Sequence, residues 1–150
     1  LVRSVQRMPL PPDWDAGRVC REYEDWLTDR FAGALRVTQS DSGVISFRWR
    51  WPALLLLRLV PTPYSEGSAR RRAYYIRGGI LARAPDPPGR FEFRVFPSEG
   101  FLVAAIHGFE PSLPWWIYSA TQARIHLWVM RRFGRYLGTL EPDRRPNVTA

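Results

Sequence analysis

The chain has 150 residues, of which 45% are hydrophobic and 14% aromatic, and its formal net charge is +8. This composition supplies a core for one ordinary domain, which excludes a disordered chain. No apolar run approaches the roughly 18 residues of a membrane-spanning helix, and the longest, Leu54 to Leu57, suits a buried strand. We therefore expect a single α+β domain over residues 1–140 and a flexible C-terminal tail over residues 141–150. The chain begins with Leu1 rather than Met and shows no signal-peptide layout, which suggests a trimmed protein or a fragment.

The N-terminal region predicts a strand followed by a helix. Residues 1–9 form a short edge strand with Val2 and Val5 as apolar anchors, and the prolines that follow end it. Asp13 or Asp15 then caps a helix that runs from about Asp15 to Leu35. Apolar residues recur along it at helical spacing: Ala16, Val19, Cys20, Tyr23, Leu27, Phe31 and Ala34. Because Cys20 lies in this stripe, we interpret it as a buried structural thiol.

The segment from residue 36 to residue 109 predicts strands. Asp41-Ser42-Gly43 is a turn between two extended segments, and Ile45, Phe47, Trp49 and Trp51 alternate with polar residues on one apolar face. Further strands are expected over 53–60, 73–83, 91–95 and 101–109. Gly78-Gly79 predicts a bend within the second of these four strands, and Gly108 a late kink in the last.

The C-terminal helix has the clearest pattern. It is expected from about Pro114 to Leu137, with Gly138 as its stop. Its inward residues recur every three or four positions: Trp115, Tyr118, Gln122, Ile125, His126, Val129, Phe133, Tyr136 and Leu137. Arg124, Arg131 and Arg135 lie on the opposite side, with Trp128 near them. The whole pattern predicts a curved antiparallel sheet of about six or seven strands packed against a long C-terminal helix.

The order of strand, helix, about six strands and long helix resembles the helix-grip fold of the START-like superfamily, also called SRPBCC. The resemblance covers nearly the whole chain and is one of topology, without a diagnostic motif. It implies a cavity between sheet and helix that binds an apolar molecule, with cyclase-like or hydrolase-like chemistry in some members. No catalytic residues are shared across the superfamily, so none is carried over. Many members have two short helices after the first strand where one is expected here, which leaves lipocalin-like and cone-shaped α+β folds open.

Gln122 and His126 form the most informative polar pair, because residues four apart lie one turn above the other on a helix. Both fall in the apolar stripe with Tyr118, where polar groups need a partner in a ligand, a water or the protein. We expect Tyr118, Gln122 and His126 to contact the ligand, with Trp49, Trp115 and Phe133 as walls. His126 is the best candidate for a general acid or base. The alternative is a structural histidine that forms a hydrogen bond with a side chain of the sheet, and we favour it over a functional role by about two to one.

The remaining chemistry-bearing residues give weaker signals. His107 is expected to face either His126 or solvent, and Glu92 and Glu110 form no acid–base pair, with Glu92 pointing to solvent. All 22 basic residues are arginine, which excludes a Schiff-base lysine and a Walker loop. With two histidines and one cysteine, we expect no metal and no cofactor, and the single cysteine agrees with a cytoplasmic protein.

Two functions follow. The first is the binding of a small, largely apolar ligand, and the residues do not decide whether catalysis accompanies it. The alternative is a non-catalytic module whose arginine-rich surface binds nucleic acid, an anionic membrane or a protein partner. Arg70-Arg71-Arg72 and the alternation of Arg48 and Arg50 with tryptophans motivate this alternative. We expect at most weak, non-specific nucleic-acid binding, and a homodimer is left open.

Overall fold

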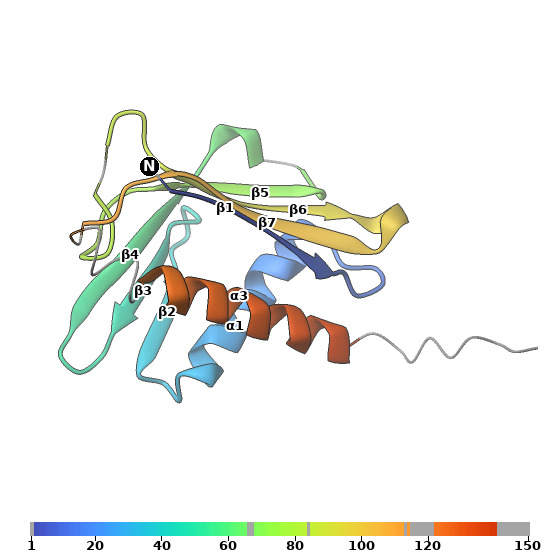
Figure 1. The fold of residues 1–150 in the computed structure, drawn as a ribbon, viewed down its shortest axis with the longest axis horizontal. Coiled ribbons are helices and arrows are strands. Elements are labelled where there is room, and N and C mark those ends of the chain that lie inside the picture. The colour runs from blue at the N-terminus through green and yellow to red at the C-terminus, as the bar shows by residue number, and fades with distance from the viewer. Residues whose placement is uncertain (1, 66–67, 84, 113, 115–121, 141–150) are drawn as a thin grey trace, which may run out of the picture.

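A computed structural model describes residues 2–65, 68–83, 85–112, 114 and 122–140. Its strands and helices follow one another along the chain as β1 (Val2–Pro9), α1 (Ala16–Arg30), β2 (Leu35–Gln39), β3 (Ile45–Trp49), β4 (Leu54–Pro61), β5 (Arg71–Ile76), β6 (Arg90–Phe96), β7 (Phe101–Phe109) and α3 (Gln122–Thr139). The strands form one seven-stranded antiparallel sheet in the order β1-β7-β6-β5-β4-β3-β2. Figure 1 shows the sheet curving around α1 and α3, which lie on the same side of it. The predicted fold class is confirmed.

One irregularity of the sheet lies between β1 and β7. Val2 pairs with Phe109 and Ser4 with Ile106, so an advance of two residues along β1 matches three residues along β7. The extra residue in β7 forms a β-bulge. Gly108 lies in this bulge with a φ of 63°, a left-handed conformation that glycine adopts without strain. The kink that the sequence predicts at Gly108 is therefore present.

Helix α1 starts where the sequence predicts and ends earlier. The Asp15 carboxylate caps it by accepting a 2.6 Å hydrogen bond from the backbone N–H of Arg18. The helix ends at Arg30 instead of Leu35 because Ala32 and Gly33 have φ values of 49° and 75°, outside the right-handed helical region. Ala34 is therefore not a helical residue, and the chain turns directly into β2.

The centre of the interior is filled by aromatic side chains. Tyr23 of α1 contacts Phe93 of β6 and Phe133 of α3, with ring centroids 5.4 and 5.0 Å apart. Phe91 lies 4.9 Å from Phe93, and Phe133 is fully buried. Side chains from both helices thus meet the sheet in one packed cluster, and α1 supplies part of the filling.

The inward face of α3 largely follows its predicted spacing. Val129, Met130, Phe133 and Leu137 are buried, whereas Arg124, Arg131 and Arg135 are exposed. Ile125 was expected inward and is instead 55% exposed, because its side chain lies about a quarter-turn from the centre of the stripe. Gly138 was expected to end the helix, which instead continues to Thr139.

Three strand predictions are wrong in detail. Val5 was expected as an anchor of β1 but is 53% exposed, because alternation gives the inner face to Met8. Trp51 was expected on the apolar face but lies beyond the end of β3 in a turn. The strand expected over 73–83 ends at Ile76. Gly79 lies against β4, where a Cβ atom would be 2.3 Å from the Leu56 carbonyl oxygen.

The expectation of one domain over residues 1–140 stays a prediction. The segment 141–150, where we expect a flexible tail, lies outside the described residues.

Candidate functional site

The structure describes half of the residues expected to bind a ligand. Trp115 and Tyr118 lie outside the described residues, and so does the side chain of Gln122, the first residue of α3. His126, Trp49 and Phe133 are described. These three side chains differ in how deeply they are buried.

His126 lies on the first turns of α3, on the inward face that continues through Val129 and Phe133. It is half-buried, and burial holds the pKa of its imidazole below the ordinary value of 6.5. The ring is therefore neutral at pH 7 and carries one N–H donor and one nitrogen acceptor. Among the described residues no side-chain hydrogen bond to the His126 ring is found, and its ring nitrogens are not among the buried unpartnered atoms of that part of the chain.

Phe133 and Trp49 mark two different halves of the interior. Phe133 belongs to the filled half, in the cluster with Tyr23 and Phe93. Trp49 belongs to the β2–β4 half, where Leu35, Ile45, Phe47 and Leu59 are buried, whereas Val37, Trp49 and Leu57 are only partly buried. The indole N–H of Trp49 donates to the Trp51 carbonyl oxygen at 3.0 Å, which fixes the ring at the rim of this half.

Two hollows flank α1, and the sequence predicted neither. The first, of about 340 Å³, lies between α1 and α3 and is lined by Trp26, Tyr136 and the acidic residues Glu22, Asp25 and Asp29. The Tyr136 hydroxyl donates a 2.5 Å hydrogen bond to Glu22, which raises the pKa of Tyr136 to about 12. This bond ties α3 to α1 across the hollow.

The second hollow, of about 320 Å³, lies between α1 and the β2–β5 part of the sheet, and its lining includes Cys20, Glu24, Arg72 and Tyr74. Burial raises the pKa of the Cys20 thiol to about 12, although a hydrogen bond with Tyr74 opposes the shift. Burial, and next the neighbouring Asp25, raise the pKa of Glu24 to about 7. Cys20 is thus an unreactive thiol as predicted, and Glu24 is a carboxyl that titrates near neutrality.

Glu24 could not be found from the sequence. Its position on the polar side of the α1 pattern predicts a solvated carboxylate. Its burial comes from the turn between β2 and β3 and the segment after β4, which close over that side of α1. These segments are distant in sequence, so no local pattern records the contact.

Glu92 corrects a prediction. It points away from Phe91 and Phe93 as expected, yet it is 5% exposed rather than solvated. On the outer face of the sheet its carboxylate oxygens form ion pairs with guanidinium nitrogens of Arg71 at 2.8 Å, Arg94 at 3.0 Å and Arg90 at 3.6 Å. Burial by itself would raise its pKa, but the hydrogen bond and charge of Arg71, followed by Arg94 and Arg90, lower it below 4.5. Three arginine side chains cover the Glu92 carboxylate. The alternation of inward and outward residues along the strand predicts the face of Glu92 but not this burial.

His107 lies on the same outer face, directly opposite Arg90 in the β6–β7 pairing. Of the two environments left open for it, facing His126 is excluded. Burial and the charges of Arg90 and Arg3 hold its pKa below 6.5. Glu110, the other acid weighed from the sequence, makes a 3.6 Å ion pair with Arg83 at the surface.

Among the described residues no group of three or more histidine, cysteine, aspartate or glutamate side chains is placed to hold a metal ion. No helix in that part of the chain is both long and apolar enough to cross a membrane.

The chain has a helix-grip fold, in which a seven-stranded antiparallel sheet curves around the C-terminal helix, and solved structures superpose on it over nearly its whole length. Ara h 8.0201 superposes with a TM-score of 0.57 at 13% identity, over 92% of this chain and 97% of that one. Ginseng major latex-like protein 151 from Panax ginseng superposes with a TM-score of 0.54 at 9% identity, over 94% and 98%. No protein-family model matches the chain, and no curated protein matches its sequence. The similarity is one of fold, and the function has to be argued from the site.

Proposed function

We propose that the protein binds a small, largely apolar molecule on the partly buried apolar surface between His126 and the β2–β4 half of the sheet. The observation that carries this proposal is His126 itself, a neutral imidazole on an inward helix face with no side-chain hydrogen bond to its ring among the described residues. A half-buried donor and acceptor beside apolar side chains is the combination that small-molecule sites use to orient a ligand. The helix-grip fold, in which a sheet curves around a helix, supports it.

The ligand in this proposal is uncharged where it meets His126, because a lowered imidazole pKa opposes pairing with an anion. A hydroxyl or carbonyl group meets that requirement. Trp49 forms one wall at the rim, and Phe133 closes the inner end through the aromatic cluster. Trp115, Tyr118 and Gln122 remain predicted contacts. His126 also remains the best candidate for proton transfer should a reaction accompany binding.

The experiment is the binding of Nile red, an uncharged fluorescent probe with a carbonyl group, after native mass spectrometry has been used to look for a co-purified small molecule. An anionic probe is unsuitable because the net charge of +8 attracts it non-specifically. We expect His126→Gln to weaken Nile red binding about fivefold or more with the melting temperature within a few degrees of wild type.

Arg124→Ala is the matched control, because Arg124 is exposed on the opposite side of the same helix. It should leave the affinity for Nile red unchanged. A lower melting temperature for His126→Gln with unchanged affinity would assign His126 a structural role and reject this site.

Weak, non-specific nucleic-acid binding, a cytoplasmic location and the open question of a homodimer stay as predictions from the sequence. The alternative function, binding through an arginine-rich surface, is supported by exposed apolar and arginine side chains at the end of the molecule near Trp49.

A further inference from the structure

The end of the molecule beside Trp49 carries a concentration of exposed apolar side chains. Trp51, in the turn between β3 and β4, is 79% exposed, and Leu54, directly opposite Trp49 in the pairing, is 38% exposed. On α3, Ile125 and Trp128 are 55% and 39% exposed. Ile125 and Trp128 are three residues apart and therefore neighbours on the helix surface. With Phe31, these residues form what we call the aromatic end.

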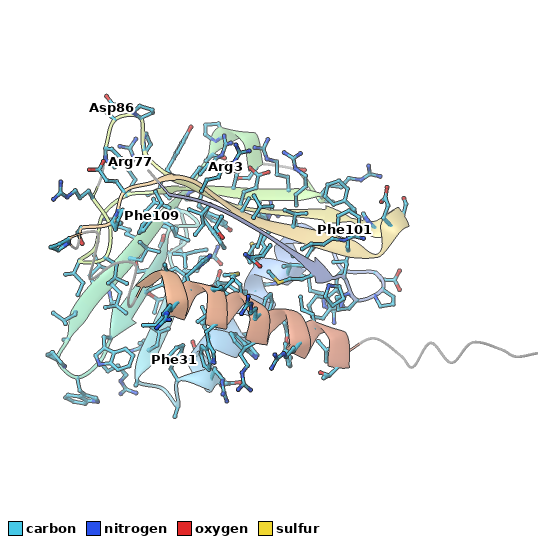
Figure 2. All side chains as sticks on the ribbon, in the orientation of Figure 1. Arg3, Phe31, Arg77, Asp86, Phe101 and Phe109 are labelled. Atoms are coloured by element: carbon cyan, nitrogen blue, oxygen red, sulfur yellow. The ribbon has the colours of Figure 1, made fainter. Side chains whose placement is uncertain are left out.

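Ring contacts and hydrogen bonds join three distant segments into this one surface. Phe31, just after α1, contacts Trp49 of β3 and Trp128 of α3, with ring centroids 6.3 and 6.4 Å apart. The backbone N–H of Arg50 donates to the Ala34 carbonyl oxygen at 2.9 Å, and its guanidinium reaches the Gly33 carbonyl oxygen at 3.5 Å. Figure 2 shows Phe31 at the lower edge of the molecule, away from Phe101 at the far end of the sheet. The turn that exposes Trp51 is thus fixed against the α1–β2 turn.

The segments that build this surface are rich in arginine: 28–36, 48–54 and 122–132 contain seven arginines and a single acid, Asp29. The acidic hollow between α1 and α3 adjoins them at Arg30, which is part of its lining. Two guanidinium groups flank Trp128, with the Arg30 carbon 5.4 Å and the Arg132 carbon 5.6 Å from its ring centroid. Arg36 and Arg48 lie directly opposite each other across β2 and β3. Like charges in that position repel, so an anionic partner would relieve a cost of the free protein.

We propose that the aromatic end docks on an anionic lipid bilayer, with Trp51 and Leu54 entering the headgroup region and the arginines contacting anionic headgroups. Tryptophan prefers the boundary between headgroups and acyl chains, and arginines near it add attraction to anionic lipid. Trp51 stands on a protruding turn, which suits insertion better than pairing with a flat protein surface. Base stacking is disfavoured at Trp128, because Arg30 and Arg132 already lie over its ring. This docking goes beyond the proposed function and does not depend on a ligand site.

The test is co-sedimentation of the full chain with vesicles of phosphatidylcholine, with or without about 30% phosphatidylserine. We expect binding to the anionic vesicles to be about tenfold or more stronger than to the neutral ones, and to weaken with added salt. Trp51→Ala combined with Leu54→Ala should reduce binding about tenfold at unchanged melting temperature, because both side chains are exposed. Val5→Ala is the control for this variant, since Val5 is exposed on the outer face of β1.

The charge arm uses a matched pair. Arg50→Glu changes an arginine of the aromatic end, whereas Arg7→Glu changes an exposed arginine that stacks on Phe101 at 3.9 Å. Both lower the net charge by the same amount. We expect Arg50→Glu to weaken binding about tenfold and Arg7→Glu to have less than a twofold effect. Equal losses for the two variants, or equal binding to neutral and anionic vesicles, would overturn the proposal.

A single-stranded oligonucleotide supplies the last comparison. If it displaces the protein from vesicles and its own binding depends on Trp51, the partner is a nucleic acid and the membrane proposal is wrong. The vesicle assay is also independent of the Nile red assay. His126→Gln should leave vesicle binding intact, so failure of one proposal is distinguishable from failure of the other.

Discussion

Glu24 shows how a single side chain links burial to pH. Its pKa is raised from 4.5 to about 7 by burial and by Asp25, against the opposing charge of Arg21. The folded protein therefore binds this proton more tightly than the unfolded chain does. Between about pH 4.5 and pH 7 the folded state holds more protons, so this group makes stability fall as pH rises through that window.

We expect Glu24→Gln to stabilise the protein at pH 8 by about 1 kcal/mol, a figure reduced for solvent screening because Glu24 is only half-buried. Below about pH 4.5 the difference should vanish, since wild-type Glu24 is then protonated in both states. Urea unfolding at a series of pH values measures it. Glu99→Gln, an exposed glutamate in the turn before β7, is the control and should show no such trend. A gain that persists unchanged at pH 4 would contradict this account.

Strand β6 uses its two faces for different kinds of stabilisation. Phe91, Phe93 and Val95 point into the aromatic core, whereas Glu92 is buried on the outer face among Arg71, Arg90 and Arg94. The arginines come from β5 and from β6 itself, and Arg71 pairs directly with Arg94. Without the carboxylate, these positive charges would repel one another across two neighbouring strands.

We expect Glu92→Gln to destabilise the protein by about 1–3 kcal/mol, less than a fully buried pair because the arginines remain partly exposed. The carboxylate has a lowered pKa, so its contribution is present above pH 4.5 and is lost as pH falls through the folded-state pKa. The destabilisation should therefore shrink in acid. Glu110→Gln removes an exposed pair, Arg83–Glu110, and should cost less than about 0.5 kcal/mol. Equal costs for the two substitutions would show that the arginine cluster adds nothing.

At the level of elements, hydrophobic periodicity predicted which helices and strands form, whereas local backbone conformation determines the residues at which they end. The β2–β3 hairpin and the α3 stripe follow from their spacing, because each has one apolar face with a clear period. The end of α1 and the end of β5 depend on backbone conformations at Gly33 and Gly79 that hydrophobic periodicity does not record. Trp51 was misplaced because β3 ends two residues before it, and Val5 because it lies three residues from Val2, so alternation cannot place both valines on one face.

Across the whole molecule, the predicted topology is present, and the interior is more completely filled than that topology implies. Tyr23 on α1 reaches Phe93 and Phe133, so α1 occupies space that a sheet and one helix would otherwise leave open. His126 and Trp49 were predicted as neighbours of an apolar space; both side chains are partly buried, and their shared role stays a prediction. The packing between α1 and α3 is a contact between distant residues, and no single segment of sequence specifies it.

Phe133 is the residue through which the two helices and the sheet meet, and its truncation tests that packing. It is fully buried and contacts Tyr23, Trp26 and Phe93. Phe133→Ala should lower the free energy of unfolding by about 3–5 kcal/mol, because it leaves a cavity that three fixed rings cannot fill. Ile125→Ala, on the same helix but 55% exposed, should change it by less than about 0.5 kcal/mol. Urea unfolding of both variants at pH 7 measures the contrast, and a cost for Phe133→Ala as small as that for Ile125→Ala would mean that α1 and α3 do not share a packed core.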